Sequence, residues 1–405
     1  MNERIRVLSV IDGLGFGGDE TRLLSMSQTL DQTRFAHSVL TLNPSAYGAA
    51  GEFQARRQQY LNAGVEVNDL SEAEPEHAWN AGGLPSRLYA KLGILRRARR
   101  LARVVRKWNV QLIDAHLESA GVVSVLAGRL SRTPVAITLY GGYSGSDVQW
   151  PLPTRVALRL ADTVITDSQI RANQMRALLQ KQAVKVAVIP NGIPQPRSHR
   201  SAEEMRRMFG LPDSRRVRVI GQVGRLIEYK GHEVLLHTAR KVIQQEPDTA
   251  FLVVGYTRNP AYKDYLRRLS ANLGIADRVV ITEYQADIAD VWNAIDVHAH
   301  ASLFDSLPIS IAEGMSLAKP AAVTAVGGIP EIVLHGRTGL IVSPGDPDAL
   351  ADALLSLVRQ PDLASRLGRC ARERYEELYC PEIMAKALES QFASMLDPNK
   401  SRSFL

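Results

Sequence analysis

The sequence predicts an α/β protein built from two doubly wound parallel sheets, one in each half of the chain. Its 405 residues are too many for one ordinary core and fit two domains of roughly 200 residues each. In both halves, short apolar runs alternate with longer amphipathic helical patterns, as is typical of parallel sheets covered by helices. Residues 190–201 interrupt this alternation with Asn-Gly and three prolines, and we expect the domain boundary there.

The apolar runs give the expected strands in chain order. In the first half they are 5–11, 37–42, 65–67, 110–115, 135–139, 163–166 and 184–189. In the second half they are 217–223, 250–254, 279–282, 296–300, 321–324 and 339–342. We therefore expect domains at 1–192 and 202–380, a linker at 193–201, and a C-terminal helix and tail at 381–405 that docks back on the N-terminal domain.

Composition excludes several classes of protein. Apolar residues make up 45% and charged residues 22%, which is ordinary for a soluble globular chain and excludes a disordered or fibrous one. The two cysteines, Cys370 and Cys380, cannot staple a chain of this length, so we expect a reducing, cytoplasmic environment. The first apolar run is too short for a signal peptide, and no run approaches the roughly 20 apolar residues of a spanning helix.

Positive charge is concentrated in one segment. The net charge is +7, and residues 87–107 hold nine lysines and arginines and no acid. Leucines and valines recur there at helical spacing, so one face could pack while the other stays cationic. Two explanations fit equally well: a solvated outer helix, or a helix that rests on an anionic membrane, such as the inner face of the plasma membrane. Nucleic acid is disfavoured as a partner, because only Tyr89 and Trp108 could interleave with bases.

The loop 12–20 follows the first expected strand and precedes a helical pattern. Its glycines satisfy the G-x-G-x-x-G fingerprint of nicotinamide and flavin enzymes, which makes a dehydrogenase the first rival hypothesis. The second strand does not end in the acidic residue that would hold a ribose, and Asp19 and Glu20 would repel a pyrophosphate. We therefore favour a different ligand, approached closely by the backbone at Gly17 and Gly18.

The second half carries two cations in the segment 221–231, between a strand and a helix. Arg225 presents a planar fork to phosphate oxygens, and Lys230 supplies a compact charge. Together they could clamp a diphosphate and stabilise the charge that builds on it as it departs. The alternative explanation is a pair of surface cations.

Two acids accompany a predicted helix over 308–318. Ser306 is expected to cap this helix and Pro308 to occupy its first turn, so Asp305 lies just outside the helix mouth. Glu313 falls among apolar residues, where an unpaired carboxylate is costly, so it needs a partner. A ribose diol could supply two hydroxyl donors, and an ion pair with an arginine is the alternative.

The spacing of Asp305 and Glu313 resembles the two-acid motif of the large retaining glycosyltransferase family known as group 1, family 4 type. The resemblance extends in the family's order over nearly the whole chain. The other matching motifs are Gly17-Gly18-x-Glu20, Asp114-Ala115-His116, Ile189-Pro190-Asn191-Gly192-Ile193, Gly224-Arg225-Leu226, Lys230-Gly231, Gly327-Gly328-Ile329-Pro330-Glu331, Gly339-Leu340-Ile341-Val342 and Pro344-Gly345-Asp346.

This resemblance implies a GT-B fold, in which two Rossmann-like domains face each other across a cleft. The second domain would bind a nucleotide-diphosphate sugar as co-substrate, with no other cofactor, and the first would bind the acceptor. By the same resemblance, Arg225 and Lys230 would bind the diphosphate, Glu313 the ribose, and Asp305 the donor sugar. His116 would face the transferring sugar from the first domain. The full set of implied site residues is Gly17, Gly18, His116, Arg225, Lys230, Asp305, Ser306, Leu307, Pro308 and Glu313.

The resemblance also implies hexosyl transfer with retention and without a metal. The pattern Asp346-Pro347-Asp348 is explained as a helix cap, and His298 with His300 lacks a third zinc ligand. The chain departs from the family at Asp305, which is usually Glu, and at Tyr140, where many relatives have His before Gly.

The family implies an acceptor that is a glycan or a lipid-linked intermediate of cell-envelope or exopolysaccharide assembly. Two alternatives remain: a GT-B nucleotide-sugar epimerase or hydrolase, and a non-catalytic carbohydrate-binding relative. An epimerase needs no acceptor, and a binding relative turns over no donor, so product analysis separates all three functions.

Overall fold

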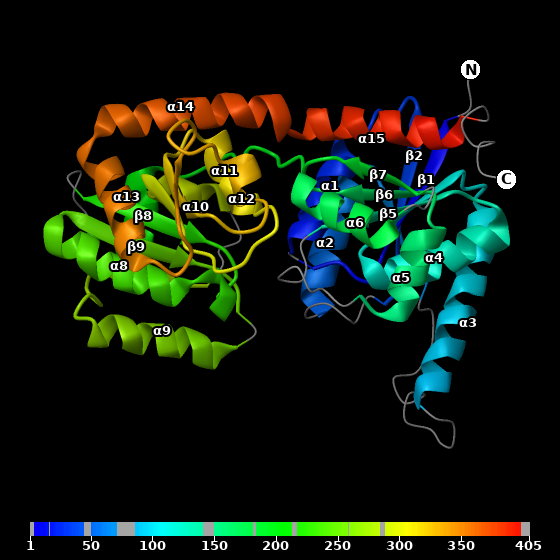
Figure 1. The fold of residues 1–405 in the computed structure, drawn as a ribbon, viewed down its shortest axis with the longest axis horizontal. Coiled ribbons are helices and arrows are strands. Elements are labelled where there is room, and N and C mark those ends of the chain that lie inside the picture. The colour runs from blue at the N-terminus through cyan, green and yellow to red at the C-terminus, as the bar shows by residue number, and fades with distance from the viewer. Residues whose placement is uncertain are drawn as a thin grey trace. The chain divides into compact units, whose positions relative to one another are not determined.

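The computed structural model describes residues 4–15, 17–43, 50–70, 86–140, 150–180, 184–212, 217–257, 259–283 and 288–397. The chain forms two compact units, each with its own parallel sheet and its own core (Figure 1). Unit 1 comprises Met1–Gly192 and Pro381–Leu405, and unit 2 comprises Ile193–Cys380. Among the described residues, no helix is both long and apolar enough to cross a bilayer.

Unit 1 contains a seven-stranded parallel sheet in the order β3-β2-β1-β4-β5-β6-β7. Its strands are β1 (Ile5–Ile11), β2 (Phe35–Thr41), β3 (Glu66–Asp69), β4 (Leu112–His116), β5 (Val135–Leu139), β6 (Thr163–Thr166) and β7 (Lys185–Val188). The chain order reverses between β1 and β4, which lie next to each other. In open sheets of this kind, ligands bind at the carboxyl ends of the strands at such a switch point.

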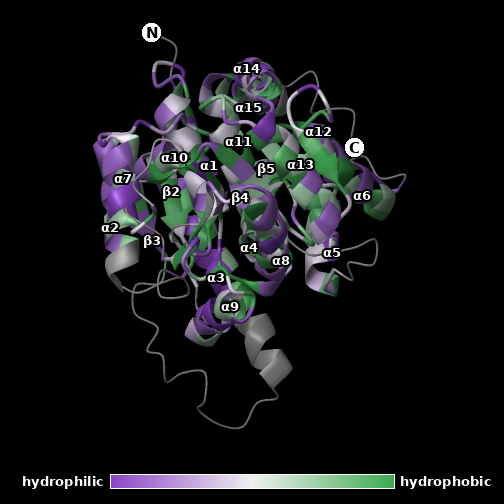
Figure 2. Cartoon of the chain, turned by 90° about the vertical axis from the view of Figure 1, so that its left-hand side faces the viewer, coloured by the Kyte–Doolittle hydropathy of each residue, from purple (hydrophilic) through white to green (hydrophobic). Residues whose placement is uncertain are grey.

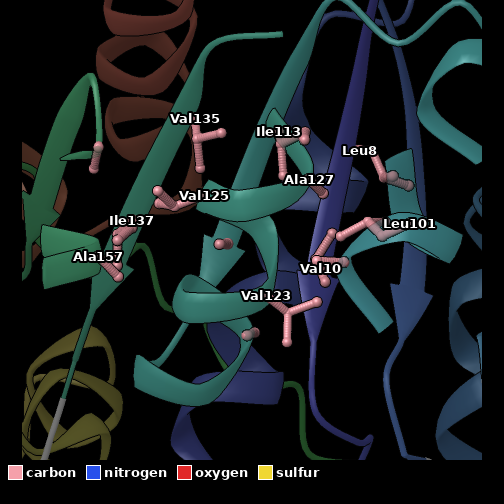
Figure 3. Packing of buried hydrophobic residues seen from close by; sticks show 14 of the residues in the cluster. Leu8, Val10, Leu101, Ile113, Val123, Val125, Ala127, Val135, Ile137 and Ala157 are labelled. Atoms are coloured by element: carbon pink, nitrogen blue, oxygen red, sulfur yellow. The ribbon is translucent and has the colours of Figure 1, made fainter. Parts of the chain in front are cut away.

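Helices cover both faces of the unit 1 sheet. The helices α3 (Ser86–Lys107), α4 (Glu118–Ser131), α5 (Leu152–Leu160) and α6 (Gln169–Leu179) contribute to the core on one face. Figure 3 shows Val123 and Val125 of α4 packed between Val10, Ile113 and Ile137 of the strands. The other face is covered by α1 (Gly18–Thr29), α2 (Ala50–Asn62) and the C-terminal helix α15 (Pro381–Leu396).

Unit 2 contains a six-stranded parallel sheet in the order β10-β9-β8-β11-β12-β13. Its strands are β8 (Arg218–Val223), β9 (Thr249–Val254), β10 (Val279–Thr282), β11 (Val297–His300), β12 (Ala321–Thr324) and β13 (Leu340–Val342). The order reverses between the neighbouring strands β8 and β11. Every strand expected from the sequence is present, and the predicted fold class is confirmed.

Two layers of helices enclose the unit 2 sheet. The first comprises α8 (His232–Gln245), α9 (Pro260–Asn272) and α13 (Pro347–Arg359). The second comprises α7 (Ala202–Met208), α10 (Ile288–Ala294), α11 (Ile309–Ser316), α12 (Ile329–Ile332) and α14 (Pro361–Leu378). The short helix α7 is largely hydrophilic, as Figure 2 shows. The Asp346 carboxylate accepts from the amides of Asp348 and Ala349 at the start of α13, so its predicted capping role is confirmed.

The segment 193–201 packs on unit 2. Ile193 is buried, its amide donates to the carbonyl of Tyr379 at 2.9 Å, and its carbonyl accepts from the Tyr375 hydroxyl at 2.6 Å. Ser198 donates to the Asp290 carboxylate at 2.7 Å. The residues that were expected to form a linker are therefore held by hydrogen bonds to the second unit.

Candidate functional site

Two loops of unit 2 meet where its strand order reverses. Residues 224–231 follow β8, and residues 301–308 follow β11, its hydrogen-bonded neighbour. Both loops leave the carboxyl ends of their strands, which is where open α/β sheets bind their ligands. The arrangement places the predicted diphosphate clamp beside the predicted two-acid motif.

Hydrogen bonds hold the two loops together. The amide of Leu303 donates to the carbonyl of Tyr229 at 2.8 Å. The buried side chain of Gln222 donates to the carbonyl of Lys230 at 2.9 Å and accepts from the amide of Ala301 at 3.0 Å. One strand residue thus satisfies a backbone group in each loop, and sequence reasoning gave Gln222 no such role.

Two glycines allow other backbone segments to lie very close to the loop 301–308. Gly231 has a φ of 68°, and a Cβ there would lie 1.9 Å from the carbonyl oxygen of Ala301. Gly327 has a φ of 50°, and a Cβ there would lie 1.7 Å from the carbonyl oxygen of Asp305. Any larger residue would have to move the loop that carries the acid.

The charged centre of the site is a pair formed by Lys230 and Asp305. Lys230 Nζ lies 2.5 Å from Asp305 Oδ2, and both side chains are only 12% exposed. The same oxygen lies 2.9 Å from His300 Nε2 and accepts from the Ser302 hydroxyl at 3.2 Å. The amide of Ser306 donates to Oδ1 at 3.1 Å. The carboxylate is therefore surrounded by donors, and it fixes the position of the Lys230 ammonium.

The pKa of Asp305 shows which of two opposing effects dominates. Burial alone would raise it, but the Lys230 ammonium and the His300 ring hold it well below its usual range. The acid is therefore ionised and forms a true ion pair with Lys230 at neutral pH. Arg225, by contrast, is exposed, and its guanidinium donates to the Tyr229 hydroxyl at 2.7 Å. The two predicted cations extend from one loop, and within the described residues an acid pairs with Lys230 but not with Arg225.

Glu313 lies in the middle of α11 and is partly buried. Its partner is the indole of Trp292, whose Nε1 donates to Oε2 at 3.0 Å, and within the described residues it pairs with no arginine. Burial raises the pKa of Glu313 to about 7, although the indole hydrogen bond lowers it in part. The sequence indicated an acid in need of a partner. Among the described residues that partner is an indole, so the alternative of an ion pair with an arginine is not observed there.

Aromatic rings connect the two acids. The rings of Trp292 and His298 lie 4.9 Å apart, and those of His298 and His300 lie 5.8 Å apart. His300 in turn contacts Asp305. The two buried histidines therefore lie between the two acids, and the described part of the chain has no group of three His, Cys, Asp or Glu arranged to hold a metal ion.

The start of α11 differs from the prediction. The helix begins at Ile309, and its N-cap is Pro308, with φ of −67° and ψ of 126° and no side-chain cap. The expectation that Ser306 caps the helix is wrong, because the extended Pro308 places the first helical amides too far along the chain. Leu307 is buried in the apolar cluster that contains Ile311. Among the described contacts of Ser306, Leu307 and Pro308, the one with the charged centre is made by the Ser306 amide, which donates to the Asp305 carboxylate.

The predicted residue His116 lies at the carboxyl end of β4 in unit 1 and is completely buried. Its Nδ1 contacts the Tyr140 hydroxyl, and its Nε2 lies 3.2 Å from Asp114 Oδ2. Arg22 lies over the Tyr140 ring, with its guanidinium carbon 4.6 Å from the centroid. The Arg22 guanidinium is also buried, and none of its nitrogens has a hydrogen-bond partner among the described residues. This polar cluster therefore has hydrogen-bonding capacity that the described side chains leave unused.

The glycine loop lies at the neighbouring strand end of unit 1. Gly17 is the N-cap of α1, and Gly18 is the first residue of that helix. A Cβ on Gly17 would lie 2.3 Å from Glu20 Oε2, and the other carboxylate oxygen of Glu20 accepts from the Gly15 amide at 3.3 Å. The close approach that the glycines predict for a ligand is made here by the protein's own Glu20.

A cavity of 330 Å³ opens at the opposite, amino-terminal edge of the unit 1 sheet. It is lined by Arg4, Arg6, His37 and Trp108, among others, and by none of the predicted site residues. The structure thus groups Lys230, Asp305 and Glu313 around the β8 and β11 ends of unit 2. It places His116, Gly17 and Gly18 at the carboxyl edge of the sheet in unit 1.

Both halves of the chain match known protein families. Residues 16–195 match the family described as Glycosyltransferase Family 4, and residues 217–360 match Glycosyl transferases group 1. The D-inositol 3-phosphate glycosyltransferase of Corynebacterium diphtheriae is 30% identical over 248 residues, which are 58% of this chain and 57% of that protein. The N-acetyl-alpha-D-glucosaminyl L-malate synthase of Bacillus anthracis is 24% identical over 75% of this chain and 80% of its own length.

Solved structures share the fold. The Anabaena protein HepE, crystallised with UDP and glucose, has a TM-score of 0.74 and 22% identity over 96% of this chain and 100% of its own. A glycosyltransferase from Rickettsia africae has a TM-score of 0.77 and 19% identity over 98% of this chain and 100% of its own. With both of its halves matched and its two sheets in place, the chain belongs to the group 1, family 4 type of glycosyltransferases with the GT-B fold.

Proposed function

We propose that this protein is a retaining, metal-independent glycosyltransferase that transfers a hexosyl group from a nucleoside-diphosphate sugar to an acceptor hydroxyl. The observation that carries the proposal is the buried Lys230–Asp305–His300 cluster at the strand switch point of unit 2. A cation held in place by an acid, with little exposure, is suited to stabilise charge on a departing diphosphate. Family membership supports the same reaction class.

The donor is proposed to bind unit 2. An ammonium group has three N–H donors, so Lys230 can keep Asp305 and still donate to the diphosphate. The exposed fork of Arg225 is free to swing from Tyr229 to the same phosphates. Glu313 would accept from the ribose hydroxyls, and Asp305 with the 306–308 backbone would contact the donor sugar. The UDP and UDP-glucose in the HepE crystals support a uridine diphosphate donor.

The proposed reaction needs orientation more than a strong base. The acceptor oxygen bonds to the anomeric carbon on the face from which the diphosphate leaves, so the configuration is retained. The bond from that carbon to the phosphate oxygen breaks, and a phosphate oxygen takes the acceptor proton. Lys230 and Arg225 supply the positive charge that a metal ion supplies in other transferases.

The acceptor is proposed to bind unit 1 near Gly17, Gly18 and His116. Within the described residues, the buried polar groups around Arg22 and Tyr140 have donors and acceptors without partners, as a hydroxyl-bearing ligand requires. The names of two relatives give inositol 3-phosphate and L-malate as their own acceptors. For this chain we propose a glycan or a lipid-linked intermediate of cell-envelope or exopolysaccharide assembly, with the enzyme in the cytoplasm.

A screen of uridine, guanosine and adenosine diphosphate sugars for thermal stabilisation tests the donor. A ligand at about 100 times its dissociation constant adds about 2.7 kcal/mol, so a true donor raises the melting temperature clearly. The preferred donor is then incubated with candidate acceptors, and NMR of the product gives the anomeric configuration. A product with the donor's configuration supports retention, and sugar conversion or release without an acceptor supports the epimerase or hydrolase instead.

Lys230→Ala tests the clamp. We expect turnover to fall about 100-fold or more, as when one preorganised donor to a transition-state anion is removed. Lys241→Ala is the matched control, because Lys241 is a unit 2 lysine paired with Asp348 at the surface. It should leave turnover unchanged. Equal turnover by the Lys230 variant and wild type would contradict the proposed site.

A further inference from the structure

The outer sides of α3, α4 and α5 form one continuous surface of unit 1. Helix α4 packs against both α3 and α5, and Figure 1 shows the three helices next to one another. Hydrogen bonds link them, from the Arg106 guanidinium to the Leu130 carbonyl and from the Arg129 guanidinium to the Leu160 carbonyl. Their inner sides are buried against the sheet (Figure 3), so their outer sides remain accessible. We call this surface the α3–α5 face.

The α3–α5 face is strongly cationic. The only acids within residues 86–140 and 150–160 are Asp114, which is buried in β4, and Glu118 at the start of α4. Among the residues of these helices and of the turn after α4 whose exposure is described, the exposed cations are Arg96, Arg99, Arg103, Arg106, Lys107, Arg129, Arg132, Arg155 and Arg159. Such an excess of positive over negative charge favours an anionic partner.

The same face exposes apolar side chains. Leu152, Val156 and Leu160 of α5 are 69%, 43% and 39% exposed, and their spacing of four residues places them in one stripe. Leu130 at the end of α4, which is 45% exposed, adds to it. A nucleic acid or an acidic protein explains the arginines but not an exposed aliphatic stripe among them. A lipid surface explains both, because headgroups attract the cations and the acyl boundary accepts the apolar residues.

We propose that the α3–α5 face binds an anionic membrane surface, with the apolar stripe of α5 entering the headgroup region. This inference rests on the proposed function only in that a lipid-linked acceptor would be met there. Binding to lipid is measured without donor or acceptor. A failure to bind lipid therefore leaves the proposed glycosyl transfer untouched, and a failure of glycosyl transfer leaves the proposed lipid binding untouched.

The test is co-sedimentation of the full chain with phosphatidylcholine vesicles, with and without phosphatidylglycerol. We expect binding only when phosphatidylglycerol is present, and weaker binding as salt is added. One variant carries Arg99→Gln, Arg103→Gln and Lys107→Gln, which lie on one side of α3. Because each surface cation contributes to the attraction, this variant should lose at least about tenfold in partition coefficient.

A second variant carries Leu152→Ser, Val156→Ser and Leu160→Ser. It should lose the part of the binding that resists salt and keep the salt-sensitive part. The control carries Arg207→Gln, Met208→Ser and Arg240→Gln at exposed positions of unit 2 and should bind like wild type. All variants should keep the wild-type melting temperature and nucleotide-sugar stabilisation. Equal wild-type binding to both vesicle types, no wild-type binding to either, or full binding by the α5 variant would overturn the proposal.

Discussion

At the scale of single residues, Glu313 makes the stability of the protein depend on pH. Burial raises its pKa to about 7 from a usual 4.5, so the native state keeps a proton that the unfolded chain has lost between these values. A state that binds more protons becomes less stable as pH rises, so the free energy of unfolding falls across this range. At about 1.4 kcal/mol per pKa unit, the full loss is roughly 3 kcal/mol, reached above pH 7.

Glu313→Gln removes this cost. We expect the variant to be more stable than wild type by roughly 2–3 kcal/mol at about pH 8 and nearly equal at about pH 4, measured by urea denaturation. Trp292→Phe is the companion variant, since it removes the indole donor that favours the ionised carboxylate. In that variant the pKa of Glu313 should be higher than in wild type. The free energy of unfolding should therefore continue to fall up to a higher pH. Parallel pH profiles for wild type and Glu313→Gln would show that Glu313 is not the group responsible.

The sequence could predict which residues matter here but not which residues they contact. Glu313 stands among apolar neighbours in its helix, so its need for a partner was predictable. The partner, Trp292, lies on α10, and only the packing of two helices brings it close. In the same way, Lys230 and Asp305 meet because β8 and β11 are neighbours in the sheet, although they are far apart in the chain.

At the scale of elements, the connection from β8 to α8 depends on Gly231. Its φ of 68° is unfavourable for other residues, and the carbonyl of Ala301 fills the place of a Cβ. Gly274 has a similar φ of 69°, but nothing lies within 4 Å of its missing Cβ. Comparing alanine at the two positions therefore separates backbone strain from steric conflict.

Gly274→Ala should cost about 1 kcal/mol, which is the strain of a left-handed residue. Gly231→Ala carries the same strain and must also push the 301–305 loop away from Lys230. We expect an additional loss of about 1–3 kcal/mol in unfolding free energy, together with weaker nucleotide binding, which Gly274→Ala should not show. Urea denaturation and calorimetric titration with UDP measure the two effects. Equal losses in unfolding free energy at Gly231 and Gly274 would mean that the 301–305 loop moves away from the new side chain at no cost.

Elements differed in how far the sequence could predict them. The strands were all found because a buried parallel strand is a short apolar run with a helix on either side, and the pattern is local. The start of α11 was misplaced at Ser306 because a serine two residues before a proline suits a cap equally well in several registers. In the structure Pro308 is extended and is itself the N-cap, next to the buried Leu307 and to the Ser306 amide that donates to Asp305. These contacts join residues to the rest of unit 2, and the local sequence pattern does not contain them.

At the scale of the whole molecule, unit 1 is discontinuous in the sequence. Its last helix, α15, is reached only after the chain has completed unit 2, and two residues separate it from α14. Phe392 and Leu388 of α15 are fully buried in the same core as Phe35 of β2. A chain that ends before residue 381 would therefore leave part of the unit 1 core uncovered while unit 2 stays complete.

Phe392→Ala tests this dependence in the full chain. The Phe392 ring lies 6.4 Å from that of Phe35, edge to face, and loss of such a buried ring costs about 3–5 kcal/mol. Hydrogen exchange should therefore accelerate in β1, β2 and α1, while strands β8 to β13 keep their protection and UDP still binds. Ile383→Ala on the same helix is the control, because Ile383 is 37% exposed and its loss should change exchange little. Faster exchange throughout unit 2 in the Phe392 variant would show that the two units unfold together, and that α15 stabilises the whole molecule instead of one sheet.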